Sequence, residues 1–262
     1  MDLLTRWIDR SANLRISAVE ASATSRSLCL LHGLSGPSAV EMSEMVAGTL
    51  LLAADQRAFH TLSLQLDLGS VSQHVDSTPE GLVRAMATSR LQPSVCARIQ
   101  ARRLGPEGLI YQSVVESEKR AVGPILEDYL HQSEQQRSRL DLETDLDGQG
   151  LPVSVRGALL RGFPKTSQDL LDRLFSDWTA RGSSWSASTP GDGLPTGPWD
   201  KLGEVEVRAH CPCSRDRALG ALLSLGPDAV ADARTKGVEM EVVCDFCRTR
   251  YGFSPDEVAA RS

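Results

Sequence analysis

The amino-acid sequence predicts an α+β fold, in which a mixed, mostly antiparallel sheet packs against helices and a small C-terminal domain follows. Residues 61–68 alternate apolar and polar side chains. Strand patterns at 70–75 and 82–88 follow them after short turns, which predicts an antiparallel meander. Residues 38–54 and 121–132 instead place apolar side chains at helical spacing. Strands joined by short turns, together with separate amphipathic helices, are typical of this fold class.

The remaining elements of the core are predicted from shorter patterns. Strands are expected where short apolar or alternating segments lie between turn residues, at residues 14–19, 28–31, 109–115, 139–144 and 151–160. Residues 94–103 contain several arginines and carry no clear pattern, and their charges favour a solvated face over an anion site. A last amphipathic helix of the core is predicted at residues 167–179.

Four sulfur-containing side chains are assigned to the core. Met42 and Met45 lie within the predicted helix at residues 38–54, where core filling is favoured over a binding surface. Cys29 and Cys96 lie in apolar or mixed segments, so we expect both to be buried structural thiols.

Composition narrows the classes of function. The chain holds 262 residues with a formal net charge of −6, which disfavours a general nucleic-acid-binding protein. No apolar run is long enough to span a bilayer, and charged residues interrupt the start of the chain, so neither a membrane span nor a secretory signal is expected. Phosphate-binding glycine loops and nucleophile motifs are missing from the sequence. We therefore expect a cytoplasmic protein that is not an enzyme and has no catalytic residues.

The composition changes within residues 181–203, where glycine, proline and serine are frequent and helical periodicity is lost. This change predicts an α+β core at residues 1–180, a linker at 181–203 and a cysteine-containing domain at 204–262. Trp185 and Trp199 are unusual residues for a spacer. They either dock on the core or offer apolar contacts to a bound protein.

Four of the six cysteines form two close pairs, Cys211-Pro212-Cys213 and Cys244-Asp245-Phe246-Cys247. Thiolates are soft ligands, and four of them suit a tetrahedral Zn²⁺ ion, so the sequence predicts one zinc per chain at Cys211, Cys213, Cys244 and Cys247. Two structural disulfides or a free dithiol pair are the alternatives. His210 directly precedes the first pair, but a complete set of four cysteines leaves it no place as a ligand.

The residues around the two cysteine pairs predict a small folded module. Helices are expected at residues 215–225 and 227–234, and strands at 238–243 and 249–253. Ser254 begins a capping box for a last helix, with proline at the first helical position. A unit of this size buries little apolar surface, so its folding is expected to depend on the metal.

Four segments around the cysteines occur in a specific combination. They are Cys-Pro-Cys-Ser-Arg-Asp-Arg at 211–217, Leu-Leu-Ser-Leu-Gly at 222–226, Glu-Val-Val-Cys-Asp-Phe-Cys at 241–247 and Tyr-Gly-Phe-Ser at 251–254. Together they resemble the zinc domain of the heat shock protein 33 family. The segment Tyr-Leu-His-Gln-Ser-Glu-Gln at 129–135 is similar to one in the core domain of that family.

This resemblance implies a redox-regulated, ATP-independent holdase chaperone of the cytoplasm, which protects unfolding proteins from aggregation under oxidative stress. It implies that the reduced, zinc-bound protein is inactive. Oxidation would form the disulfides Cys211–Cys213 and Cys244–Cys247 and release the zinc. The resemblance also implies that unfolded proteins are the partners, that the oxidised protein forms a homodimer, and that residues 1–180 serve in substrate binding and dimerisation.

Two other functions stay open from the residues alone. The first is a structural zinc module that mediates contacts with protein or RNA and has lost the redox switch, since the linker at residues 181–203 is short and rich in glycine, proline and serine. Acidic residues outnumber basic ones in 204–262, which disfavours RNA. The second is a thiol oxidoreductase that uses Cys211 and Cys213. Salt-sensitive RNA binding would favour the structural zinc module, and turnover with a dithiol would favour the oxidoreductase. Suppressed aggregation after oxidation would favour the chaperone.

Overall fold

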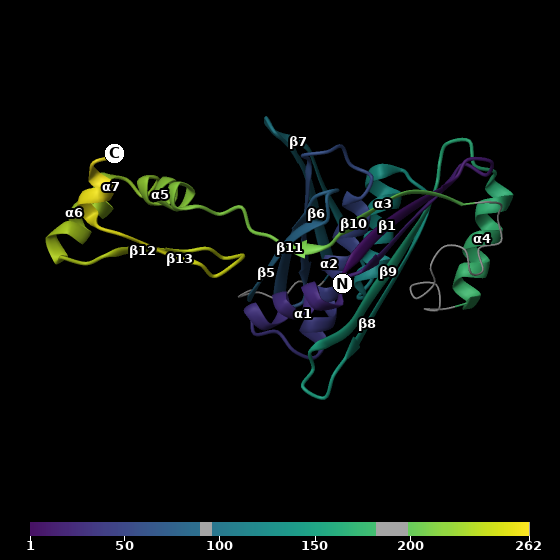
Figure 1. The fold of residues 1–262 in the computed structure, drawn as a ribbon, viewed down its shortest axis with the longest axis horizontal. Coiled ribbons are helices and arrows are strands. Elements are labelled where there is room, and N and C mark those ends of the chain that lie inside the picture. Colours follow the sequence, from purple (N-terminus) through teal and green to yellow (C-terminus); the bar gives the residue numbers. More distant parts are fainter. Residues whose placement is uncertain (90–95, 182–198, 262) are drawn as a thin grey trace. The chain divides into compact units, whose positions relative to one another are not determined.

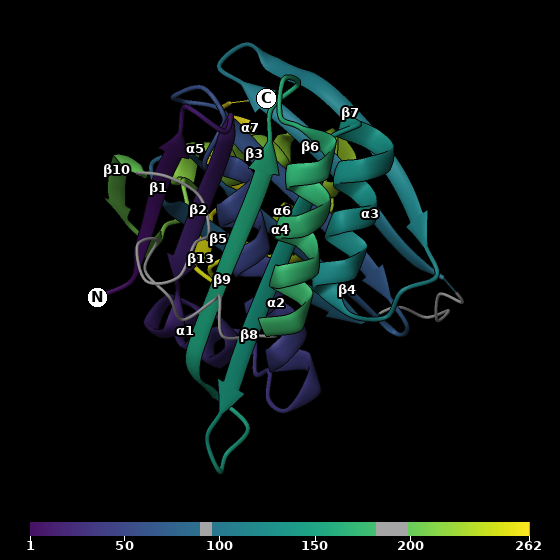
Figure 2. The same cartoon turned by 90° about the vertical axis from the view of Figure 1, so that its right-hand side faces the viewer.

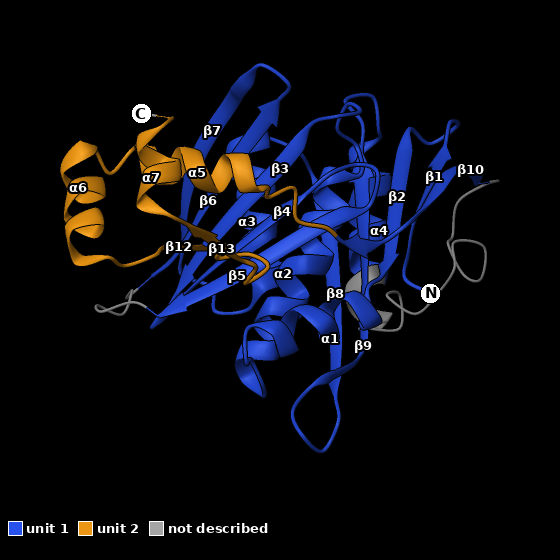
Figure 3. Ribbon diagram, turned by 60° about the vertical axis from the view of Figure 1, so that its left-hand side comes forward, with its two compact units in different colours: residues 1–209 blue, residues 210–262 orange. Residues whose placement is uncertain are grey.

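The computed structural model describes residues 1–89, 96–181 and 199–261, which form two compact units, Met1–Ala209 and His210–Ser262 (Figure 3). Both units combine helices with mostly antiparallel sheets, which confirms the predicted α+β class. Within the described residues, no helix is both long and apolar enough to cross a membrane.

One sheet of the first unit has five antiparallel strands and joins the two ends of that unit (Figure 1). In spatial order its strands are β10 (Asp200–Glu206), β1 (Leu3–Asp9), β2 (Leu14–Glu20), β9 (Pro152–Gly162) and β8 (Ser138–Leu146). Strands β2, β8 and β9 confirm the patterns predicted at residues 14–19, 139–144 and 151–160.

The other sheet of this unit has six strands and contains the predicted meander. In spatial order its strands are β11 (Arg208–Ala209), β5 (Leu82–Ser89), β4 (Val71–Ser77), β3 (Thr61–Leu68), β6 (Ala97–Gly105) and β7 (Gly108–Ser117). Only the short β11 runs parallel to its neighbour in this described sheet. The arginine-rich segment at residues 94–103 thus contributes strand β6, whose Ala97, Ile99 and Ala101 face the core while arginines alternate with them.

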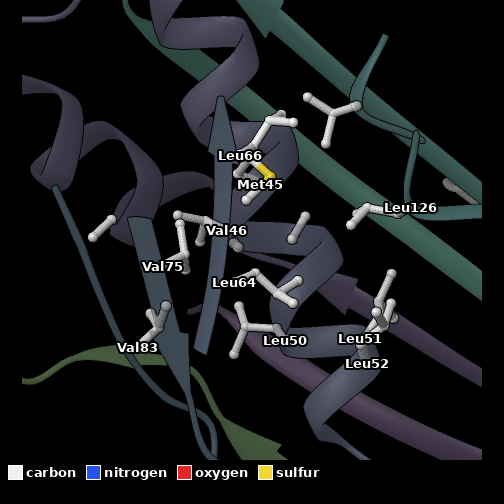
Figure 4. Close-up of a cluster of buried hydrophobic side chains, with 14 of the residues drawn as sticks. Met45, Val46, Leu50, Leu51, Leu52, Leu64, Leu66, Val75, Val83 and Leu126 are labelled. Atoms are coloured by element: carbon white, nitrogen blue, oxygen red, sulfur yellow. The ribbon is translucent and has the colours of Figure 1, made fainter. Parts of the chain in front are cut away.

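Helix α2 (Pro37–Ala53) contacts both sheets and forms the centre of the core. Most of its side chains are buried because apolar residues surround the helix instead of forming one stripe. Met45, Val46 and Leu50 lie close to side chains of β3 and β4 (Figure 4). Met42 and Met45 are completely buried, so both predicted core methionines are confirmed.

Three further helices flank these sheets: α1 (Ser22–Leu31), α3 (Val122–Glu134) and α4 (Gln168–Arg181). Figure 2 shows α4 across β9, on the opposite side of the five-stranded sheet from α2. Leu171 and Leu174 of α4 pack there on Leu14, Ile16 and Leu160. Trp199 packs against this same cluster, which supports the docking alternative for that residue, whereas Trp185 lies outside the described residues.

Two predictions for the core are wrong. Residues 28–31 belong to helix α1 and not to a strand. The helix buries Thr24, Ser25, Leu28 and Cys29, and two of these four are polar, so the apolar pattern alone does not reveal the helical face. Cys29 is buried as expected, but Cys96 is exposed.

Strand β10 lies partly in the segment that was expected as linker. Residues 200–203 pair with β1, from Gly203 opposite Arg6 to Asp200 opposite Ile8. The division between the two compact units therefore falls after Ala209, later in the chain than the expected boundary at residue 203. The partner strand lies at the other end of the first unit, so no local pattern in the sequence could indicate this pairing.

The second unit has the elements that the cysteine-containing module was expected to have. They are α5 (Arg215–Leu223), α6 (Pro227–Lys236), β12 (Met240–Val243), β13 (Arg250–Phe253) and α7 (Pro255–Ala259). The Ser254 side chain accepts a hydrogen bond from the Glu257 backbone N–H at 3.1 Å, as the predicted capping box requires. Its core is small and consists of Ala218, Leu219, Leu222, Val230, Phe253 and Val258.

Candidate metal centre

Two short turns place the four cysteine sulfurs. Cys211 and Cys213 directly precede α5, which begins at the N-cap residue Ser214. Cys244 and Cys247 lie in the turn between β12 and β13. In this turn the Arg248 N–H donates to the Cys244 carbonyl at 2.8 Å, and Arg248 adopts the left-handed conformation with φ 58°. This hydrogen bond closes the turn that carries both sulfurs of the second pair.

The four sulfurs form one cluster. The Sγ atoms of Cys211, Cys213, Cys244 and Cys247 all lie within 4.8 Å of one another, and each side chain is partly buried. Two of these approaches join one cysteine of each pair: 3.7 Å from Cys211 to Cys244 and 3.2 Å from Cys213 to Cys247. Sulfurs at about 2.3 Å from a tetrahedral Zn²⁺ are about 3.8 Å apart, so this donor set fits zinc in both chemistry and size.

None of the six cysteines, all of which lie in the described residues, is part of a disulfide. Because the sulfurs of one pair meet those of the other pair, a metal held by all four would tie the start of α5 to the β12–β13 hairpin. Such a link would stabilise a unit whose own apolar core is small.

Hydroxyl groups on β13 and in the second turn surround two of the sulfurs. The Tyr251 hydroxyl lies 3.2 Å from the Cys213 sulfur, and the Thr249 hydroxyl lies 3.2 Å from the Cys247 sulfur. Burial acts against the charged form of Cys247, but hydrogen bonds from the Thr249 side chain and backbone, aided by Cys213, lower the pKa of the Cys247 thiol to about 6. The Cys213 sulfur in turn raises the pKa of Tyr251 to about 12, so this phenol stays protonated at neutral pH.

Arginines near the cluster have structural contacts of their own. The Arg215 guanidinium lies 4.2 Å from the ring centre of Phe253 and forms an ion pair with Glu257 at 2.8 Å. Arg217 donates to the Pro212 carbonyl at 3.0 Å, which holds the first cysteine turn against α5. His210 is not part of the thiol cluster.

Sequence reasoning found the four cysteines but missed the roles of Thr249 and Tyr251. Both residues follow the second cysteine pair closely, and Tyr251 lies on the strand that returns from this pair. Thr249 precedes that strand by one residue, and the alternation of both residues with Arg250 would have indicated that their side chains point to the same side of the chain.

Comparisons with known proteins extend the likeness beyond the segments around the cysteines. A family model described as "Hsp33 protein" matches residues 2–254. The "33 kDa chaperonin" of Pelobacter propionicus is 27% identical over 99% of this chain and 93% of its own length. The "33 kDa chaperonin" of Thermus thermophilus is 27% identical over 98% of this chain and 86% of its own length.

A solved structure has the same fold. The crystal structure of the 33 kDa chaperonin (heat shock protein 33 homolog) from Thermotoga maritima superposes with a TM-score of 0.83 and covers 98% of this chain and 96% of its own. The sequence identity of that pair is 21%, so the likeness concerns the fold. Because the family model spans nearly the whole sequence, including the first hundred residues, the chain belongs to the Hsp33 family.

Proposed function

We propose that this protein is a redox-regulated, ATP-independent holdase chaperone, which binds unfolding proteins after oxidation of its thiol cluster and loss of zinc. The observation that carries this proposal is the arrangement of four cysteine sulfurs, none of them in a disulfide, within 4.8 Å of one another in a unit with a small apolar core. The relatives are named 33 kDa chaperonins, which supports the chaperone part of the proposal.

In the reduced protein, Cys211, Cys213, Cys244 and Cys247 would hold one Zn²⁺. The ion would keep the four thiols deprotonated and would link their two turns. Thr249 and Tyr251 orient two of the sulfurs by hydrogen bonding. Arg217 holds the backbone of the first turn in place.

Hydrogen peroxide is the oxidant that the proposal names. A cysteine thiolate attacks one peroxide oxygen, the O–O bond breaks, and the cysteine becomes a sulfenic acid while hydroxide leaves. The neighbouring thiolate then attacks the sulfenic sulfur, forms the disulfide and releases a second hydroxide, and two protons from solvent convert both hydroxides to water. Each disulfide thus transfers two electrons to one peroxide, and the pairs would be Cys211–Cys213 and Cys244–Cys247.

Loss of the four thiolates removes the link between the two turns. The second unit then has only its own core to oppose the conformational entropy of its chain. Its unfolding exposes Leu219, Leu222 and Phe253, which are buried in the folded unit and would add apolar surface for unfolded proteins.

The other parts of the proposal concern the rest of the chain. Residues 1–180 would bind unfolded proteins and form a homodimer after oxidation, and the second compact unit, His210–Ser262, would be the switch. The function needs no catalytic residue and no nucleic acid, and we place the protein in the cytoplasm.

The test measures zinc content, free thiols and suppression of aggregation of a denatured protein, before and after treatment with peroxide at mild heat. The proposal expects release of one zinc, loss of four thiols and gain of holdase activity. Zinc retained without holdase activity would leave a structural zinc module for protein or RNA contacts. Catalytic turnover of a dithiol by the purified chain would instead identify a thiol oxidoreductase.

A further inference from the structure

The first unit contains a pocket that has no part in the proposed thiol switch. Its volume is about 470 Å³, within the range of about 300–1,000 Å³ that is usual for small-molecule sites. The end of α2 and the turn after it form one side, and β6, β7 and β9 complete it. The lining residues are Leu52, Asp55, Gln56, Arg57, His60, Arg103, Ile110 and Arg161.

Positive charge predominates in this pocket. Three arginines and a single aspartate line it, which leaves an excess of two positive charges when His60 is neutral. Asp55 forms ion pairs with Arg161 at 3.1 Å and with Arg15 at 2.5 Å. The Asp55 carboxylate is therefore compensated inside the protein by Arg161 and Arg15, and among the described residues it forms no ion pair with the other two lining arginines, Arg57 and Arg103.

Arg57 supplies an available cation. Its side chain is exposed, and no carboxylate among the described residues lies within ion-pair distance of it. Arg103, by contrast, forms an ion pair with Glu134 and lies 5.5 Å from the ring centre of Tyr111. Arg103 is therefore held in place, while Arg57 is free to move onto a ligand.

Buried polar atoms of the lining residues lack partners. The Arg161 side chain is only 8% exposed, yet its Nε has no hydrogen-bond partner in the part of the chain that the structure describes. Arg103 Nε and Gln56 Oε1 also lack a hydrogen-bond partner among the described residues. The two Nε–H groups are donors that an oxygen atom of a ligand would satisfy, whereas Gln56 Oε1 is an acceptor.

We propose that this pocket binds a small organic phosphate. The three arginines come from the α2–β3 connection, β6 and β9, so they approach the pocket from different sides. A phosphate group presents several oxygens in a tetrahedral arrangement and carries close to two negative charges, which matches both the directions and the excess charge. Leu52 and Ile110 provide an apolar wall for the remainder of the ligand.

The experiment is isothermal titration calorimetry on the full-length, reduced, zinc-loaded protein in a buffer free of phosphate and sulfate. Inorganic phosphate and glycerol 3-phosphate are the probes, and succinate is the dicarboxylate comparison. We expect one site per chain and at least tenfold weaker succinate binding. Arg57→Gln should weaken glycerol 3-phosphate binding about tenfold or more, because Arg57 is a charged hydrogen-bond donor that takes part in no ion pair within the described part of the folded chain.

Two more variants make the test specific. Ile110→Trp enlarges an exposed wall residue and should block the pocket without crowding the core. Arg173→Gln makes the same charge change at an exposed arginine of α4 and should leave binding unchanged. The proposal is overturned if neither phosphate probe binds, if succinate binds as tightly, or if both Arg57→Gln and Ile110→Trp bind like the wild type.

Discussion

The hydroxyl of Tyr251 lies 3.2 Å from the sulfur of Cys213. Tyr251 is on β13 and Cys213 precedes α5, so this hydrogen bond joins two elements of the second unit across the thiol cluster. The pKa of Tyr251 is raised to about 12, first by its hydrogen bond with Cys213, so the phenol is a hydrogen-bond donor at neutral pH. A donor of this kind lowers the electron density on the sulfur and makes it a weaker nucleophile.

Tyr251→Phe should therefore make the cluster more sensitive to oxidation. Without the donor, the Cys213 thiolate is more nucleophilic, and we expect thiol loss in peroxide to become about two- to fivefold faster. The measurement is the time course of free thiols in the zinc-loaded protein. Tyr111→Phe is the matched control, because that hydroxyl bonds Ser133 in the first unit at 2.6 Å. Equal rates for Tyr251→Phe and the wild type would contradict the assigned role.

Metal removal should affect the two compact units differently. The second unit has only six residues in its buried apolar cluster, whereas the first has a large core around α2. After chelation we expect α5, α6 and α7 to lose their amide protection, while β3, β4 and α2 keep theirs. Hydrogen exchange measured by mass spectrometry on the full chain would show this.

The same exchange pattern is expected for Cys244→Ser without a chelator. Cys96→Ser is the control, because Cys96 is exposed and belongs to the first unit. Protection of α5 that survives both chelation and Cys244→Ser would show that the second unit folds without metal.

Glu44 should make the stability of the first unit depend on pH. Burial raises the pKa of Glu44 to about 7, and the nearby carboxylates of Glu41 and Asp141 add to this effect. Because its pKa in the folded state lies above the ordinary value of 4.5, the protonated side chain favours folding below about pH 4.5. That contribution is lost as the pH rises through about 7.

Glu44→Gln removes this titration. Relative to the wild type, we expect the variant to gain roughly 2 kcal/mol in the free energy of unfolding between pH 5 and pH 8.5. Urea unfolding of both proteins at several pH values measures the difference, and Glu20→Gln at an exposed position is the control. A difference between wild type and variant that does not change with pH would refute the prediction.

The elements that sequence patterns predicted correctly carry their signals locally. The meander of β3, β4 and β5 has alternation within each strand and turn residues between them. The cysteine pairs are local as well, since each pair lies in a single turn and thiolate chemistry limits the ligands that suit them. Helix α2 was predictable because apolar residues extend over its whole length.

The elements that were missed depend on distant partners. Helix α1 has Ala21 at its N-cap, and Asp2 accepts hydrogen bonds from the Ala23 and Thr24 N–H groups at 3.2 and 2.6 Å. The side-chain carboxylate of Asp2, on a distant part of the chain, thus caps a helix whose own N-cap residue has no side chain that could do so. Strands β1 and β10 likewise pair although they lie at opposite ends of the sequence of the first unit. The local sequence of either strand therefore does not reveal that it belongs to a sheet.

Unfolding of the second unit and oxidation of its thiols can be separated by changing Phe253. This side chain is almost fully buried in the small core, and the Arg215 guanidinium lies over its ring at 4.2 Å. Phe253→Ala should cost about 3–5 kcal/mol, which is large for a unit with so few buried side chains, and it leaves all four cysteines in place.

If exposed apolar surface activates the chaperone, Phe253→Ala should suppress aggregation of a denatured protein without peroxide. Phe246→Ala is the control, because Phe246 lies in the second cysteine turn and outside the buried apolar cluster. Light scattering of the aggregating protein, with zinc content and free thiols measured in parallel, distinguishes the two causes. An unfolded second unit with four free thiols and no holdase activity would mean that the disulfides themselves, and not the loss of structure, create the binding surface.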